Sequence, residues 1–172
     1  MNLSFKKCSN DDLDKLIKIS RTTFIDAFEK DNNPDDFKEY INSAFSKENS
    51  MAELSNPDAL FYFAYHNDIL VGYFKINQKG AQTESFDQNT IELERIYVLN
   101  KFQGQHIGKQ MLFKTIKLAK LKEAPFLWLG VWEKNSAAIR FYQRYGFIKF
   151  NTHHYYIGTD KQTDWLMKLN LV

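Results

Sequence analysis

The most constraining feature of this sequence is an alternating strand pattern that leads through a glycine-containing loop into an amphipathic helix. From Ile91 to Val98, polar and apolar residues alternate with the period of a strand that has one buried face. Apolar residues then recur three or four positions apart from Ile107 to about Lys122, which predicts a helix. Pro125 blocks its continuation, and the apolar run Phe126 to Trp132 is typical of a strand buried on both faces. This order predicts a right-handed strand–helix–strand crossover.

The rest of the chain predicts helices before this unit and strands on both sides of it. Aromatic and β-branched runs at 60–65 and 69–76 flank a polar turn and predict a hairpin, whereas the polar segment 78–89 predicts a loop or a distorted strand extension. Further strands are expected at 3–7, 147–157 and 163–171, and further helices at 13–29, 34–44, 46–54 and from Asn135 to Gly146. The order β-α-α-α-β-β-β-α-β-α-β-β predicts one mixed α/β domain over residues 1–172, with helices on both faces of its sheet.

Length and charge limit the classes of function. The 172 residues carry 23 basic and 21 acidic side chains without a basic run, which argues against nucleic acid as a partner. No apolar run approaches the roughly 20 residues of a membrane helix, and the first residues contain no apolar stretch of signal length, so we expect no membrane partner. Cys8 is the only cysteine, which excludes an internal disulfide and favours a reducing compartment. We therefore expect a cytoplasmic protein with no metal site.

The loop before the predicted helix is the first candidate for a functional site. It reads Gln103, Gly104, Gln105, His106, Ile107, Gly108 and Lys109. The free N–H groups of a helix's first turn favour a bound anion, glycines let the backbone approach a ligand, and Lys109 adds positive charge. These features are typical of a phosphate site, although a plain strand-to-helix turn can carry the same glycines.

A second motif follows the buried strand. Its residues are Asn135, Ala138, Phe141, Tyr142, Gly146 and Phe147. Together with the loop, this motif resembles the GNAT superfamily of acetyltransferases, whose loop pattern is Gln/Arg-x-x-Gly-x-Gly/Ala. The departure is His106, which stands where the family usually has its first glycine, while Gly104 lies two places earlier. The departure concerns the loop's conformation and leaves the helix N-terminus intact.

The resemblance extends along the chain and is closest to PaiA-type spermidine/spermine N-acetyltransferases, through residues 5–9, 91–98, 128–135 and 162–164. It implies a twisted, mixed, mostly antiparallel sheet of about seven strands, acetyl-CoA as co-substrate and a small primary amine as acceptor. The cofactor-binding residues that it implies are Ile96, Tyr97, Val98, Gln103, Gly104, Gln105, His106, Ile107, Gly108, Lys109, Asn135, Ala137, Ala138, Tyr142 and Arg144. Among them, the backbone N–H groups of Ile96 and Val98 would bind the pantetheine arm where the next strand splays away, and such donors can polarise the thioester.

Acetyl transfer to an amine requires a proton acceptor, a stabilised oxyanion and a proton for the departing thiolate. Glu92 and Glu94 are candidate acceptors, since they lie two residues apart and share a strand face unless a bulge intervenes. Solvated glutamates on the polar side of the strand are the alternative. The resemblance assigns Tyr142 to protonate the thiolate, which a phenol pKa of about 10 permits, and core packing is its alternative.

Several questions about substrate and assembly stay open at the level of sequence. Asp26, Glu29 and Asp31 could line an acidic entrance for a polycationic amine, or could be solvated. The same chemistry could act on a protein or peptide N-terminus or lysine, and a non-catalytic acetyl-CoA-binding module is the third interpretation. A homodimer would cover the exposed edges of the sheet, but monomers also protect such edges.

Overall fold

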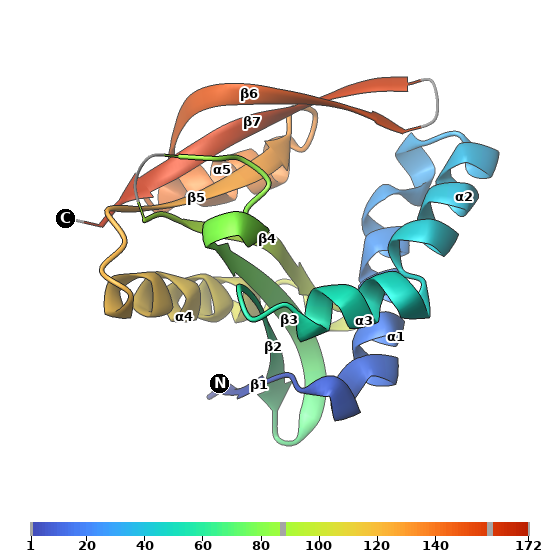
Figure 1. The fold of residues 1–172 in the computed structure, drawn as a ribbon, viewed down its shortest axis with the longest axis horizontal. Helices are drawn as coiled ribbons and strands as arrows, with labels where there is room; N and C mark the ends of the chain where they lie inside the picture. Colours follow the sequence, from blue (N-terminus) through green and yellow to red (C-terminus); the bar gives the residue numbers. More distant parts are fainter. Residues whose placement is uncertain (1, 87–88, 158–159, 172) are drawn as a thin grey trace.

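A seven-stranded sheet forms the centre of the protein, with strand order β1-β2-β3-β4-β5-β7-β6 (Figure 1). The computed structural model describes residues 2–86, 89–157 and 160–171. The strands are β1 (Ser4–Lys7), β2 (Ala59–His66), β3 (Ile69–Gln78), β4 (Ile91–Val98), β5 (Phe126–Trp132), β6 (Ile148–Ile157) and β7 (Asp160–Asn170). Only β4 and β5 are paired in parallel in this sheet, so the expected mixed, mostly antiparallel sheet is confirmed.

Helices cover both faces of the sheet, as predicted. The helices are α1 (Leu13–Phe28), α2 (Pro34–Ala44), α3 (Lys47–Ser55), α4 (Ile107–Leu121) and α5 (Ser136–Arg144). In Figure 1, α4 and α5 lie on one side of the sheet, and α1, α2 and α3 lie on the other. The buried cluster under α4 and α5 includes Ile107, Met111 and Ile139, and the cluster under α1 includes Leu16 and Ile19. None of the helices in the described part of the chain combines the length and apolar character needed to cross a bilayer.

The predicted crossover is present, but its two strands part early. Strand β4 pairs with β3 at seven positions along its length, whereas it pairs with β5 only at Ile91↔Leu127 and Glu92↔Trp128. Beyond these two pairs the strands diverge, and the sheet has a gap. Strand β5 is also less covered than its apolar sequence predicts, because Gly130 is exposed while Leu129 and Val131 are buried. The gap and the open glycine mark the place where a ligand can reach the sheet.

Candidate active site

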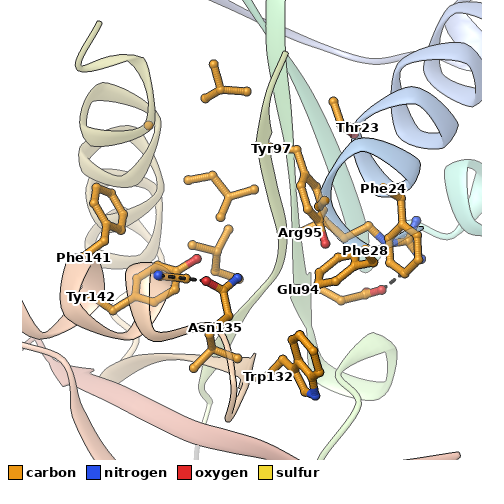
Figure 2. Close-up of a pocket in the computed structure, with 18 of the residues that line it drawn as sticks. Thr23, Phe24, Phe28, Glu94, Arg95, Tyr97, Trp132, Asn135, Phe141 and Tyr142 are labelled. Carbon is orange, nitrogen blue, oxygen red and sulfur yellow. Dashed lines mark hydrogen bonds and ion pairs between the residues drawn. The ribbon is translucent and has the colours of Figure 1, made fainter. Parts of the chain in front are cut away.

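A cavity of about 820 Å³ lies at the gap between β4 and β5, within the usual range for ligand pockets. Its lining comes from both faces of the sheet: the loop before α4 and one face of α5 on one side, and α1, α2 and β7 on the other. Figure 2 shows Asn135, Phe141 and Tyr142 across the cavity from Phe24, Phe28, Glu94, Arg95 and Tyr97. The cavity therefore passes through the sheet and gives a ligand access to side chains on both faces.

The backbone of β4 presents hydrogen-bond donors to this gap. The N–H of Leu99 donates to the carbonyl of Val71 on β3. Because donors alternate in direction along an antiparallel pair, the N–H groups of Tyr97 and Arg95 also point toward β3, and those of Ile96 and Val98 point into the gap. Two such donors, separated by one residue, suit an extended chain with amide carbonyls, which is the character of the pantetheine arm of coenzyme A.

A β-bulge in β4 determines which side chains reach each face. Lys75 pairs with Arg95 and Ile76 pairs with Leu93, so Glu94 is the extra residue. The bulge shifts the alternation by one position. As a result, Leu93 and Ile96 both pack in the cluster beneath α4 and α5, while Glu94 and Arg95 join in an ion pair of 3.0 Å. The bulge thus concentrates charged groups of β4 on the face covered by α1 and α3.

The N-terminus of α4 borders the cavity on the opposite face. His106, which precedes the helix, has φ 60° and ψ 14°, and Gly104 has φ 75°. The histidine therefore adopts the left-handed conformation for which a glycine is usual, and the loop is accommodated without that glycine. A Cβ at Gly108 would lie 3.9 Å from Phe141 and 4.0 Å from Val98, which are ordinary contacts. The protein's own packing thus does not require glycine at 108, but close approach of a ligand would.

Most of the residues expected to bind the cofactor line this cavity. They are Ile96, Tyr97, Val98, Gln103, Gly104, His106, Ile107, Gly108, Lys109, Asn135, Ala138, Tyr142 and Arg144. The exceptions are Gln105 and Ala137. The exposed Gln105 side chain turns back to the Lys101 carbonyl, 3.5 Å away, and Ala137 is exposed in the first turn of α5. The exposed Lys109 and Arg144 place positive charge on this side of the cavity.

Asn135 and Tyr142 are held in place by α5. The Asn135 side chain caps the helix by accepting a hydrogen bond from the N–H of Ala138 at 3.1 Å, as its sequence position predicts. Tyr142 is 8% exposed and packs against Phe141 and Phe147, with ring centroids 5.3 and 5.7 Å away. Burial raises the pKa of Tyr142 above its ordinary value, so the phenol keeps its proton across the physiological pH range. Its ring packs in the core while its side chain also lines the cavity.

Glu92 and Glu94 both line the cavity, on the face opposite Tyr142, and Asn77 joins them. Its Nδ2 donates to Glu92 at 3.0 Å and to Glu94 at 2.5 Å. Glu92 also accepts hydrogen bonds from the backbone N–H and the hydroxyl of Thr83. Burial raises the pKa of Glu92, and the charge of Glu94 adds to the rise, against the opposing hydrogen bonds from Thr83 and Asn77.

Glu94 has a different electrostatic environment. It lies 2.6 Å from the Lys75 ammonium and 3.0 Å from the Arg95 guanidinium. Burial disfavours its ionisation, but the charges of Arg95 and Lys75 prevail and lower the pKa of Glu94. Glu53 on α3 contacts the same two cations, at 2.7 and 2.8 Å. Glu94 is therefore held in its ionised form by the two cations, whereas the pKa of Glu92 is shifted in the opposite direction.

Sequence reasoning missed a third carboxylate in the cavity. Asp164 on β7 pairs in register with Trp132 on β5 and with His153 on β6. Burial raises the pKa of Asp164 to about 6, while the His153 imidazole and a hydrogen bond from the Tyr155 hydroxyl oppose the rise. Its Oδ1 is buried without a hydrogen-bond donor among the described residues. The sequence carried no distinctive signal for Asp164, because β7 contains several other polar residues and most of its positions are only partly buried.

Aromatic rings complete the wall around these carboxylates. Phe28 lies edge-on to Trp132 with centroids 6.4 Å apart, and Phe24 stacks with Tyr40 at 5.6 Å. All four side chains line the cavity, so Trp132 faces the pocket rather than a closed core. The acidic entrance expected from the end of α1 is instead solvated: Asp26, Glu29 and Asp31 are exposed and do not line the cavity. Among the described residues, no group of three or more His, Cys, Asp or Glu side chains is arranged to hold a metal ion.

Comparison with known proteins agrees with this geometry. Residues 13–147 match the model of the acetyltransferase (GNAT) family. The chain belongs to that family. It is an acetyl-CoA-dependent N-acetyltransferase of GNAT type, and its gap, helix N-terminus and donor-bearing strand fit acetyl-CoA as co-substrate. A chain from Lactobacillus delbrueckii subsp. lactis named as an uncharacterized N-acetyltransferase is 38% identical over 164 residues, covering 95% of each protein.

Two relatives carry a substrate in their names. The spermidine N(1)-acetyltransferase of Thermoplasma acidophilum is 27% identical over 151 residues, covering 86% of this GNAT chain and 89% of that protein. The spermine/spermidine N(1)-acetyltransferase of Bacillus subtilis is 34% identical over 88 residues, covering 51% of this chain and 57% of that protein. The crystal structure of the PaiA N-acetyltransferase from T. acidophilum in complex with coenzyme A superposes with a TM-score of 0.78 at 26% identity, over 99% of both chains.

Proposed function

We propose that this GNAT enzyme acetylates a primary amine of a small polycationic substrate such as spermidine or spermine. The observation that carries the proposal is the division of charge across the sheet. Lys109 and Arg144 border the cavity on the α4 side, whereas Glu92, Glu94 and Asp164 line it on the other side. Arg95 also lines this second side, but its charge is shared between Glu94 and Glu53, so carboxylates remain in excess there. This arrangement favours phosphates at one end and ammonium groups at the other. The names of the Thermoplasma and Bacillus relatives support the same class of substrate.

In this proposal the carboxylates prepare the nucleophile. An ammonium group with a pKa of about 10 must lose a proton before it attacks. Glu92 is the better suited acceptor, because burial raises its pKa, and a water molecule at its remaining acceptor site would relay the proton. Glu94, held ionised by Arg95 and Lys75, would attract and orient the ammonium.

The remaining steps use the gap and α5. Acetyl-CoA supplies the thioester that the amine attacks. The N–H groups of Ile96 and Val98 would hold the pantetheine arm, and a donor in this row would stabilise the oxyanion that develops during transfer. Tyr142, kept protonated by burial, would give its proton to the departing thiolate as that charge forms. The single buried thiol, Cys8, is compatible with our placing the enzyme in a reducing compartment such as the cytoplasm.

The proposal is tested by following thiol release from acetyl-CoA with a panel of acceptors. We expect release with spermidine, spermine and 1,4-diaminobutane, and much less with an aminoglycoside or lysine peptides. Thiol release only with peptides would indicate that the acceptor is a protein or peptide and not a small amine. Binding of acetyl-CoA without release from any amine would indicate a non-catalytic module.

A further inference from the structure

Asp164 is the carboxylate of the cavity that the mechanism above does not use. Glu92 accepts hydrogen bonds from Thr83 and Asn77, and Glu94 contacts two cations. Asp164, in contrast, has a buried Oδ1 without a donor in the described part of the chain. A buried carboxylate oxygen without a donor is costly, and a cation that reaches the other oxygen, Oδ2, from the cavity would offset this cost.

The position of Asp164 separates it from the site of acetyl transfer. It stands on β7, two strands from β4 in the sheet. At a strand spacing of about 4.8 Å this corresponds to at least about 10 Å, because β4 and β5 have already diverged at the level of Trp132 and Asp164. A Cβ at Gly130 on the intervening strand would lie 3.3 Å from Asp164 Oδ2, closer than most real contacts. Glycine at this position thus leaves room for the carboxylate beside β5, where it faces the cavity.

The surroundings of Asp164 suit an ammonium group on a methylene chain. Trp132 pairs with it across the strands, and the side chains of Trp132 and Tyr155 both line the cavity. Aromatic faces and a carboxylate together attract an ammonium more strongly than either does alone. Tyr40 also lines the cavity: burial raises the pKa of its phenol, Arg95 opposes the rise, and the charges of Glu94 and Asp164 add to it. One cavity therefore contains two separated anionic positions joined by an aromatic wall.

We propose that Asp164 binds a second ammonium group of the amine substrate, so that the enzyme selects diamines and longer polyamines over monoamines. The inference rests on the proposed function and deepens it: one nitrogen reacts near Glu92 and Glu94, and a charged nitrogen further along the same molecule occupies the Asp164 position. The methylene chain between them lies along the aromatic wall, where it is shielded from water.

The test compares two amines of equal carbon length, butylamine and 1,4-diaminobutane, on the wild type and on Asp164→Asn. We expect the wild type to prefer the diamine. The variant should lose about 10- to 100-fold in kcat/KM for the diamine, mainly through KM, because a charged hydrogen bond is lost. For butylamine it should stay within about twofold of the wild type. Asp68→Asn is the matched control, because Asp68 lies in the turn between β2 and β3, is exposed and does not line the cavity, so this variant should change the turnover of neither amine.

Two results would overturn the inference. An equal fall in kcat for both amines would place Asp164 at the reacting nitrogen, and an unchanged preference for the diamine would show that Asp164 does not bind it. Coenzyme A affinity, measured for each variant, verifies that the cavity is folded. Calorimetric titration of 1,4-diaminobutane into the coenzyme A complex separates the two proposals. If Asp164→Asn loses this binding, the inference is supported even when no turnover is seen. If the diamine is acetylated equally well with and without Asp164, the proposed function stands and the inference fails.

Discussion

Replacement of Gly108 by alanine should stabilise the protein and weaken its binding of coenzyme A. Gly108 is the second residue of α4 and lines the cavity at the helix N-terminus. An added Cβ meets Phe141 at 3.9 Å and Val98 at 4.0 Å, so it creates no clash within the protein. Alanine is favoured over glycine within helices by up to about 1 kcal/mol, and at this terminal position we expect about 0.5–1 kcal/mol.

The same methyl group would stand between the first-turn N–H groups and a bound phosphate. Weakening one anion contact costs about 1–2 kcal/mol, or about tenfold in Kd. At a coenzyme A concentration of about 100 times the wild-type Kd, binding stabilises the wild type by about 2.7 kcal/mol, but a tenfold weaker variant by only about 1.4 kcal/mol. The order of stability should therefore reverse when the ligand is added.

Thermal melting with and without coenzyme A measures both effects. We expect Gly108→Ala to melt about 1–4 °C above the wild type in buffer and below it with saturating ligand. Gly80→Ala is the matched control, because no atom of the described residues lies within 4 Å of a Cβ at Gly80, and Gly80 does not line the cavity. A lower melting temperature in buffer would refute the packing argument. Equal stabilisation of both proteins by coenzyme A would refute a role for Gly108 in phosphate binding.

Further substitutions test the other parts of the site. Tyr142→Phe should lower kcat by about 100-fold while coenzyme A affinity is retained, in a steady-state thiol assay. Glu94→Gln should lower the melting temperature, because Lys75 and Arg95 lose a shared counter-charge. His106→Gly should raise unfolding free energy by about 0.5–1 kcal/mol in denaturant titration, since a left-handed residue is relieved. Burial raises the pKa of Asp164 to about 6, so the protonated carboxyl stabilises the fold at acidic pH, and this contribution is lost as the pH rises through 6. The melting temperature of Asp164→Asn relative to the wild type should therefore increase from pH 4 to pH 7.

Most elements could be predicted because their signals are local. The stripe that begins at Ile107 and the Asn135 cap each depend on a few neighbouring residues, and both elements begin where expected. Strand β7 was predicted from residue 163 but begins at Asp160. Its first residues are polar and show no alternation of hydrophobicity. They are in a strand because β6 lies alongside and pairs with them, and that information is not local.

The two sides of the site differed in how far they could be predicted. The coenzyme A side follows from contiguous motifs in the sequence, and residues from both motifs line the cavity. On the amine side, Glu92 and Glu94 of β4 were candidates from the sequence, but the rest of the wall is assembled from α1, α2, β5, β6 and β7, so no short pattern marks it. The bulge at Glu94 left a trace in the sequence, because the consecutive charged residues Glu94 and Arg95 interrupt the alternation of β4, but only the pairing with β3 shows that this interruption is a bulge. The position of the Arg95 side chain likewise depends on its hydrogen bond to Glu53, which is 42 residues away in sequence.

Three features that lower stability line this cavity, and each can be tested for a role in function. Left-handed residues also occur away from it, at Asn67, Asp68, Lys79 and Glu123, so strain alone does not mark the site. His106 adopts a left-handed conformation, Gly108 weakens a helix that would accept alanine, and Asp164 holds a buried oxygen without a donor among the described residues. Each costs on the order of 1 kcal/mol or more, and a sequence selected for stability alone would remove all three. If one of these features were only a packing defect, a substitution that removes it would raise stability and leave activity unchanged. If each relief of strain here instead raises stability while lowering coenzyme A binding or diamine turnover, the cost belongs to the chemistry. His106→Gly is the most informative variant, because glycine keeps the left-handed loop conformation and removes only the side chain. Any change in coenzyme A affinity in this variant would therefore come from the lost imidazole and not from a changed loop.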